Sequence, residues 1–293
     1  NVVVEDFMNR KLCPDFDDSQ QYAAVVREYL ILLKHLCQNN KGLQRIGSNA
    51  ATLQLLMEVV LAGAHSNFDN KPLDHLAIEV LLAVAPVINL RVSPGSRILA
   101  LISDALSRAC DIHRFDTASM LSFLVARLAD NSHNMQVLVE NEEHILPILL
   151  SLVMFPRNET LVSLALEAIQ RLLNFSFTAP MLRRIHSIQG CLGVFVRLVC
   201  GKPVMIALHR STHVSNEDRI RAANILLKVA EGSGGIAALQ EHEQELVELL
   251  TNINLSLGKY NQNDVAHLTV LLASIMYALV PTEAPYLKAL EKL

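Results

Sequence analysis

Two histidines four residues apart form the pair in this sequence best spaced to hold a metal ion. His209 and His213 would share one face of a helix, and such a spacing suits chelation of zinc. The stretch that contains them, near 201–214, reads as an insertion rather than a rigid helix, and no third ligand is evident. We therefore predict no metal site and no cofactor.

Two other patterns resemble short motifs found in enzymes. Gly232–Ala237 fits G-x-G-x-x-A, but a dinucleotide site needs that turn after a strand, whereas here it follows a helical pattern. A helix C-cap is the simpler interpretation. Ser256 and Lys259 fit S-x-x-K without the companion sequences of that motif. Because no catalytic constellation is present, we predict that the protein is not an enzyme.

The cysteines and the overall composition narrow the class of protein. The five cysteines form no C-x-x-C pair, so they indicate neither a zinc knuckle nor a disulfide framework, and reduced thiols in the cytosol or nucleus are the simple interpretation. The net charge is -4, and no uncharged apolar run approaches the roughly 18 residues that span a bilayer. We therefore expect no membrane contact, no small-molecule substrate and no DNA contact. The cysteines are Cys13, Cys37, Cys110, Cys191 and Cys200.

The elements that carry these residues have the periodicity of α-helices. Between Leu161 and Leu173, apolar residues recur three and four positions apart and cover most of the helix circumference. That coverage is expected for a helix packed between neighbours on several sides. Strand-like alternation is sustained nowhere, so the sequence predicts an all-α protein.

The helices recur as a repeated unit. Four segments each combine a long apolar helix, a polar break and a short apolar turn, and markers in those turns lie 92, 47 and 54 residues apart. The first interval holds a weaker unit with Val92 at its midpoint, and the last holds the insertion near 201–214. A period of about 40–47 residues is typical of HEAT and armadillo repeats. The markers are Ile46, Leu138, Ile185 and Leu239.

Repeats of this kind are stable only when stacked, because each one shields the apolar face of its neighbour. We therefore expect one armadillo/HEAT-like α-solenoid domain over 1–293, a right-handed superhelix of five to six helical repeats. Since the sequence begins at Asn1 rather than Met, we also expect it to be part of a longer protein.

The four strong repeats share a pair of polar residues near the end of the long helix. In each pair a basic residue or histidine stands three positions before another polar residue, which places both on one helical face. Stacking would align the pairs as a polar ladder that grips a partner segment; the alternative is a solvated helix edge. The pairs are His35 and Gln38, Arg127 and Asp130, Arg171 and Asn174, and Lys228 and Glu231.

A basic block precedes a stretch rich in glutamate. From Val229 to Leu250 there are five glutamates and no lysine or arginine. Adjacent blocks of opposite charge could steer a charged partner, or they could be ordinary charged surface. The basic block includes Arg183, Arg184, Arg197 and Arg210.

Several segments, taken in order, carry a family resemblance. Ile145–Asn174 reads like an armadillo repeat from its second helix to the Asn of its third. Leu61–Phe68 holds an Ala-His-Ser turn and is followed by the apolar helix Leu76–Ala85, and Asp218–Ala230 is rich in Arg, Ala and Leu. This order resembles the armadillo region of the ARID-containing large subunits of SWI/SNF (BAF/PBAF-type) chromatin-remodelling complexes, which have a similar helix after an Ala-His-Ser-like turn.

The resemblance implies a non-catalytic nuclear scaffold. In that family this region clamps a helical segment of the ATPase subunit and contacts the other core subunits, while the DNA-binding ARID domain lies elsewhere. Two alternatives remain open: a cytoplasmic armadillo adaptor, and a regulatory helical domain attached to an enzyme. The residues expected to line a groove for a partner helix are Met120, Leu124, Met181 and Phe195, with burial in the core as the alternative.

Overall fold

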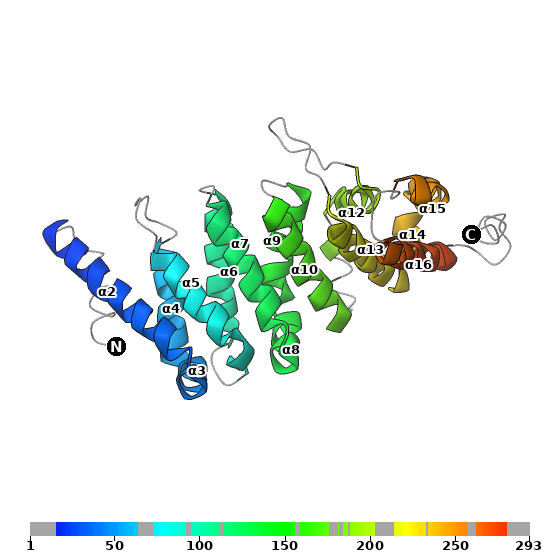
Figure 1. Ribbon diagram of the computed structural model, residues 1–293. Helices are drawn as coiled ribbons and strands as arrows, with labels where there is room; N and C mark the ends of the chain where they lie inside the picture. The colour runs from blue at the N-terminus through cyan, green and yellow to red at the C-terminus, as the bar shows by residue number, and fades with distance from the viewer. Residues whose placement is uncertain are drawn as a thin grey trace. The chain divides into compact units, whose positions relative to one another are not determined.

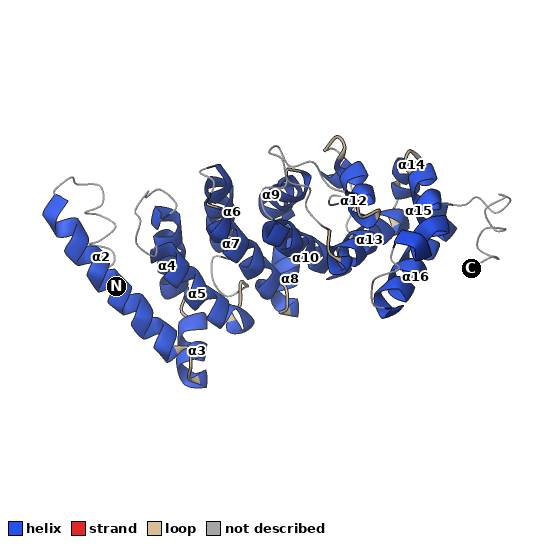
Figure 2. Cartoon of the chain, turned by 45° about the horizontal axis from the view of Figure 1, so that its top comes forward, coloured by secondary structure: helices blue, strands red, loops and turns tan. Residues whose placement is uncertain are grey.

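Every regular element that the structure describes is a helix, which confirms the all-α prediction (Figure 2). The chain forms two compact units, residues 1–145 and 146–293, and we treat each separately. The computed structural model describes residues 16–63, 73–91, 95–111, 114–155, 159–175, 181, 184–186, 188–202, 214–232, 234–256 and 262–279.

The helices follow one another in groups of three. Unit 1 contains α2 (Phe16–Leu36), α3 (Asn40–Gly47), α4 (Ala50–Gly63), α5 (Leu73–Val84), the 3₁₀ turn η1 (Ala85–Val87), α6 (Gly95–Asp111), α7 (Phe115–Leu128) and α8 (Ser132–Glu140). The boundary between the units falls within α9 (Glu142–Met154). Unit 2 continues with α10 (Glu159–Phe175), α12 (Cys191–Val199), α13 (Asn216–Glu231), α14 (Gly235–Gln240), α15 (Glu243–Ser256) and α16 (Gln262–Leu279).

Each complete group has a short first helix or turn followed by two longer helices, the second and the third. In unit 1 the third helices α2, α5 and α7 lie side by side, and the second helices α4 and α6 pack against α5 and α7 (Figure 1). In unit 2 the third helices α10, α13 and α16 contact one another in order, while α12 and α15 pack against α13 and α16. Three helices per repeat is the armadillo pattern, whereas HEAT repeats usually have two.

The markers found in the sequence coincide with the short first helices. Ile46 lies in α3, Leu138 in α8 and Leu239 in α14, while Ile185 lies in the short helical segment 184–186, and all four side chains are buried. The predicted repeat is therefore confirmed at these positions. Val92, the midpoint of the first interval, lies outside the described residues.

Hydrogen bonds across unit 1 show the repeat length directly. The Lys34 ammonium bonds to Glu79, 45 residues later, and the Thr117 hydroxyl bonds to Asp74, 43 residues earlier. The Leu90 backbone N–H bonds to the Asn134 side chain, 44 residues later. Because each bond joins neighbouring repeats, its sequence separation equals the period of roughly 40–47 residues expected for armadillo repeats.

The polar breaks between repeats are helix N-caps. The Asn39 side chain accepts a hydrogen bond from the Lys41 N–H at the start of α3, and Asn131 accepts one from the His133 N–H at the start of α8. An asparagine in this position satisfies a backbone donor that the first turn of a helix leaves unpaired. In these two repeats, the cap explains why a polar residue interrupts the apolar pattern.

A buried ion pair joins the two central repeats of unit 1. The Asp74 side chain is 0 % exposed, and its Oδ2 lies 2.8 Å from Arg114 Nη2 and accepts a hydrogen bond from the Thr117 hydroxyl at 3.1 Å. Arg114 Nη1 also donates to the Gly63 carbonyl at 2.6 Å, at the C-terminal end of α4. One guanidinium thus links α4, α5 and the start of α7.

A buried asparagine fixes the connection after α5. Asn134 on α8 accepts a hydrogen bond from the Leu90 N–H at 2.8 Å and donates one to the Ile88 carbonyl at 2.9 Å. Both backbone groups belong to buried residues, so the amide satisfies a donor and an acceptor that water does not reach.

The remaining fold expectations have the following outcomes. Within the described ranges, no single helix is long and apolar enough to cross a membrane; α3 and α4, bent by 79°, meet those criteria only as a pair. Most of the insertion near 201–214 lies outside the described residues. The single domain over 1–293 and the right-handed superhelix stay predictions.

Candidate functional site

One face of each third helix is exposed, and the same helical positions form it in every repeat. Along each third helix, buried residues recur three and four positions apart and turn inward, and the residues between them remain half-buried or exposed. We call this exposed face the ladder face. It comprises Ile31, His35 and Gln38 on α2 and just beyond it; Glu79 and Ala83 on α5; Phe123, Arg127 and Asp130 at α7; Glu167, Arg171 and Asn174 on α10; Asn224, Lys228 and Glu231 on α13; and Val270, Ser274 and Tyr277 on α16.

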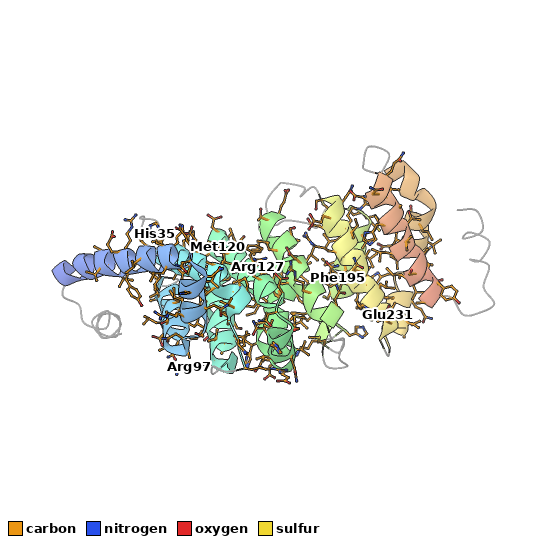
Figure 3. The ribbon with its side chains drawn as sticks, turned by 60° about the horizontal axis from the view of Figure 1, so that its bottom comes forward. His35, Arg97, Met120, Arg127, Phe195 and Glu231 are labelled. Carbon is orange, nitrogen blue, oxygen red and sulfur yellow. The ribbon has the colours of Figure 1, made fainter. Side chains whose placement is uncertain are left out.

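In unit 1 the ladder face carries two of the predicted pairs on helices that are not neighbours. Arg127 Nη1 lies 3.3 Å from Asp130 Oδ2, and His35 and Gln38 are both exposed. Figure 3 labels His35 on α2 and Arg127 on α7. Helix α5 stands between α2 and α7. It contributes Glu79, whose carboxylate pairs with Lys34 of α2 at 2.6 Å.

In unit 2 the two predicted pairs lie on the adjacent helices α10 and α13. Lys228 Nζ lies 2.7 Å from Glu231 Oε2. Arg171 pairs with Glu167 at 2.5 Å rather than with Asn174, because a carboxylate one turn earlier attracts a guanidinium more strongly than a neutral amide does. Asn174 is exposed at the end of α10.

Arg221 joins α10 to α13 beside these pairs. Its guanidinium contacts Asp218 at 3.0 Å and Glu217 at 2.5 Å on its own helix, and Glu167 at 3.7 Å on α10. It also donates to the Ser163 hydroxyl at 2.9 Å. Only 13 % of the Arg221 side chain is exposed, so this cluster is screened less by solvent than a surface pair. It holds the two rungs of unit 2 at a fixed spacing.

Arg221 and Glu167 were missed by the sequence reasoning, although a signal existed. Glu167 and Arg171 are four residues apart, as are Glu217 and Arg221, and glutamate four positions before arginine is a favourable pair on a helix. The search for pairs three residues apart, which identified the ladder, therefore overlooked pairs four residues apart on the same helical face.

Three of the four expected groove residues belong to the core. Leu124, Met181 and Phe195 are buried, so the alternative interpretation holds for them, and only Met120 is partly exposed. The exposed apolar residues of the ladder face are instead Phe123, Val270 and Tyr277, the last with 75 % of its surface exposed. Phe123 stands seven residues before Asp130, and that spacing of two helical turns could have identified it.

The basic block is only partly described. Arg184 is half-buried in the segment 184–186, and Arg197 is exposed on the second helix α12, away from the ladder positions. Arg183 and Arg210 lie outside the described residues. A role for the block in steering a partner stays a prediction.

The glycine motif that resembles a dinucleotide-binding site forms the junction between two helices. Gly232 caps α13, and Gly234, at φ +83°, precedes α14. A side chain at Gly235 would collide with the Val229 carbonyl, so the glycines permit a close backbone approach. His209, His213 and Lys259 lie outside the described residues, and among the residues that are described no three His, Cys, Asp or Glu side chains form a metal-binding group.

Cys191 is buried and Cys110 is half-buried, and neither thiol is activated. Burial raises the pKa of Cys191 to about 12, and burial together with the charge of Asp111 raises the pKa of Cys110 to about 11. Since the thiolate is the reactive form, alkylation of both residues at pH 8 should be at least ~10-fold slower in the folded chain than in the denatured chain. Mass spectrometry of iodoacetamide-treated peptides measures this; equal rates in the two states would contradict the burial.

Comparison with solved structures defines the class of fold. The chain is similar to a designed armadillo repeat protein solved in complex with the peptide (KR)4, with a TM-score of 0.59 and 16 % sequence identity over 95 % of this chain and 98 % of that one. Two engineered proteins from a structural genomics consortium match with TM-scores of 0.56 and 0.55, at 16 % and 14 % identity, over 94 % of this chain and 98 % of each. No family model and no curated protein matches the sequence. The fold is therefore an all-α, armadillo-like solenoid.

Proposed function

We propose that this protein is a non-catalytic scaffold that binds a segment of a partner protein along its ladder face. The observation that carries the proposal is the recurrence of one exposed stripe on successive third helices, with charged pairs on α7, α10 and α13 and apolar side chains on α7 and α16. Within each unit, a segment lying across neighbouring third helices would meet an equivalent rung once per repeat. The designed armadillo repeat protein was solved with a bound peptide, which supports a protein partner as the class of ligand.

The rungs are suited to binding because their geometry is fixed before a partner arrives. In unit 2, Glu167 holds Arg171 and Glu231 holds Lys228, so these long side chains have already lost much of their rotamer freedom. A partner that bonds to groups ordered in this way pays a smaller ordering cost. An exposed pair such as Lys228–Glu231 contributes little to stability, so rearranging it on binding would cost the fold little.

Apolar residues on the same face provide anchors. Phe123 stands one turn before Arg127 on α7, and Tyr277 on α16 occupies the position that Glu231 occupies on α13. Aromatic and arginine side chains dominate the binding energy of many protein interfaces when partner groups cover them. The ladder face therefore combines regularly spaced charged pairs with exposed apolar side chains, as recognition of an amphipathic segment requires.

The particular complex that we propose is a SWI/SNF-type chromatin remodeller, in which this chain would hold a helical segment of the ATPase subunit in the nucleus and contact other core subunits. This part of the proposal rests on the resemblance of the turn at Leu61–Phe68 and of the helices 76–85 and 218–230.

A pull-down with the purified ATPase segment tests both the proposed binding surface and the proposed complex. The double variant Arg171→Ala/Asn174→Ala should capture at least ~10-fold less segment than the original chain, because it removes one rung. Arg97→Ala, an exposed arginine on the second helix α6 that belongs to neither the ladder face nor the basic block, is the matched control and should capture as much as the original. Far-UV circular dichroism confirms that each variant is folded.

Different results would exclude the proposed binding surface and the proposed complex. Undiminished capture by the double variant would exclude the ladder face of unit 2 as the binding surface. No capture by the unaltered chain would exclude the remodeller assignment.

A further inference from the structure

Two of the first helices in unit 1 have the same arrangement of caps and buried markers. Helices α3 and α8 lie at the same edge of the unit (Figure 1), and each begins after an asparagine N-cap, Asn39 or Asn131. The buried markers Ile46 and Leu138 each stand seven residues after the cap. A residue of α3 therefore has its structural equivalent in α8, 92 residues later in the sequence.

At the end of these helices, a serine in one repeat corresponds to a glutamate in the other. Ser48 is the C-cap of α3, and Glu140 is the last residue of α8. The Glu140 carboxylate accepts a hydrogen bond from Gln136 Nε2 at 2.9 Å, and Gln44 occupies the Gln136 position in α3. Helix α3 thus carries the amide donor of this contact but a neutral hydroxyl in place of the carboxylate.

The Ser48 side chain is exposed, and its hydroxyl is only weakly held. The hydroxyl donates to the Arg45 carbonyl at 3.4 Å, which is long for a hydrogen bond between two oxygens. Gln136 and Glu140 are exposed as well, although Arg91 of the preceding repeat bonds to Gln136. Exposure is therefore a property of this position in the repeat and does not depend on α3 being in the first described repeat.

The charges around Ser48 favour an added anion. Arg45 stands three residues before it and is exposed, and no aspartate or glutamate occurs between Glu28 and Glu58. Negative charge at Ser48 opposes the dipole of α3 but favours that of α4, the longer helix, which begins two residues later. A basic residue shortly before a serine is also the charge pattern by which one class of protein kinases selects its substrates.

We propose that Ser48 is a phosphorylation site, and that its phosphate takes the position that the Glu140 carboxylate has in α8. The Ser48 Oγ forms a bond to the γ-phosphorus of ATP on a kinase that selects basic sequences. The bond from that phosphorus to the bridging oxygen breaks, ADP leaves, and the hydroxyl proton passes to the catalytic base of the kinase.

The phosphate on Ser48 carries a charge of about −1.5 to −2 at pH 7 and has three acceptor oxygens. It accepts a hydrogen bond from Gln44 and pairs with Arg45, and it thereby fastens the end of α3 to the start of α4. Ser48 does not belong to the ladder face, so this proposal stands independently of the proposed function.

Treatment of the full chain with cyclic-AMP-dependent protein kinase and ATP, followed by mass spectrometry of its peptides, tests the site. We expect a phosphate at position 48. In Arg45→Ala its initial rate of formation should fall at least ~10-fold, because the kinase loses the charge that it recognises. Lys41→Ala is the matched control, since it removes an exposed cation of the same helix seven residues from Ser48, and its rate should be unchanged.

Two results of this experiment would overturn the assignment of the site. One is the absence of phosphate at position 48 of the folded chain while an isolated peptide of residues 41–52 is phosphorylated there. The other is an equal rate in Arg45→Ala and in the original chain.

Hydrogen exchange tests whether the chain holds the phosphate. Amides of residues 40–52 should exchange at least ~2-fold more slowly in the phosphorylated chain, since an anion at this junction gains a pair on α3 and the dipole of α4. Ser48→Glu, which introduces the carboxylate found in α8, should slow exchange in the same direction, whereas the neutral variant Ser48→Gln should not. Unchanged or faster exchange after phosphorylation would show that α3 does not hold the phosphate as α8 holds Glu140.

Discussion

Replacing Arg114 with alanine is expected to lower the free energy of unfolding by about 3–5 kcal/mol. The substitution removes the cationic partner of the Asp74 carboxylate, which is 0 % exposed in the original chain, and it removes a donor to the Gly63 carbonyl at the end of α4. An unpaired buried charge is among the few defects that destabilise a protein this strongly. Chemical denaturation followed by circular dichroism measures the loss.

The control for this prediction is Lys34→Ala. Lys34 and Glu79 also pair across one repeat, at 2.6 Å, but both side chains are substantially exposed, so their loss should change stability by less than about 1 kcal/mol. The double variant Asp74→Ala/Arg114→Ala should lose less than the sum of its single variants, because neither charge is then left unpaired. A loss at Arg114→Ala no larger than that at Lys34→Ala would show that the ion pair does not join the repeats.

The second large effect is expected at Asn134, where alanine should lower the free energy of unfolding by about 2–4 kcal/mol. The amide satisfies the Leu90 N–H and the Ile88 carbonyl; without it the buried Leu90 N–H loses its partner, and the Ile88 carbonyl keeps the longer hydrogen bond from Asn131 Nδ2, at 3.4 Å. The same denaturation experiment measures the change.

A nearly isosteric variant separates hydrogen bonding from packing. Asn134→Asp keeps the acceptor for the Leu90 N–H but loses the N–H donor to Ile88, and it introduces a buried charge, so it should be no more stable than Asn134→Ala. If Asn134→Ala were as stable as the original chain, the connection after α5 would be held by other contacts.

Much of the fold could be predicted from the sequence because each stacked repeat has a similar local pattern of apolar and polar residues. The pattern at Leu161–Leu173 predicted a helix, and α10 spans Glu159–Phe175. The markers Ile46, Leu138 and Leu239 fall in first helices because each must insert one apolar side chain between neighbouring repeats. The repeat containing η1 was only weakly visible, since its first helix is reduced to a 3₁₀ turn, Ala85–Val87.

The contacts of individual side chains were harder to predict. A helix turns by about 100° per residue, so neighbours in sequence can face opposite environments: Phe123 is exposed on the ladder face, while Leu124 is buried. Composition alone does not distinguish the two. The partner of Arg171 depended on which nearby acceptor carried a charge, and the bonds of Arg221 to α10 depended on which helix stacks beside α13. The latter is a tertiary property.

Comparison between repeats shows which exposed apolar residues of α2 correspond to buried positions elsewhere. In isolation, Val25, Leu32 and Leu36 look like scattered surface residues, which are common in folded proteins. Only the burial of the same positions on α7 and α13 identifies them as one half of a helix–helix contact.

Site-specific photo-crosslinking tests the binding role of the third-helix surface most directly. Benzoylphenylalanine is placed either at position 228, on α13, or at position 197, on the second helix α12, and each chain is irradiated with the purified ATPase segment of the remodeller. We predict a covalent adduct from position 228 and none from position 197. An adduct from position 197 alone would place the partner on the second helices and would contradict the account.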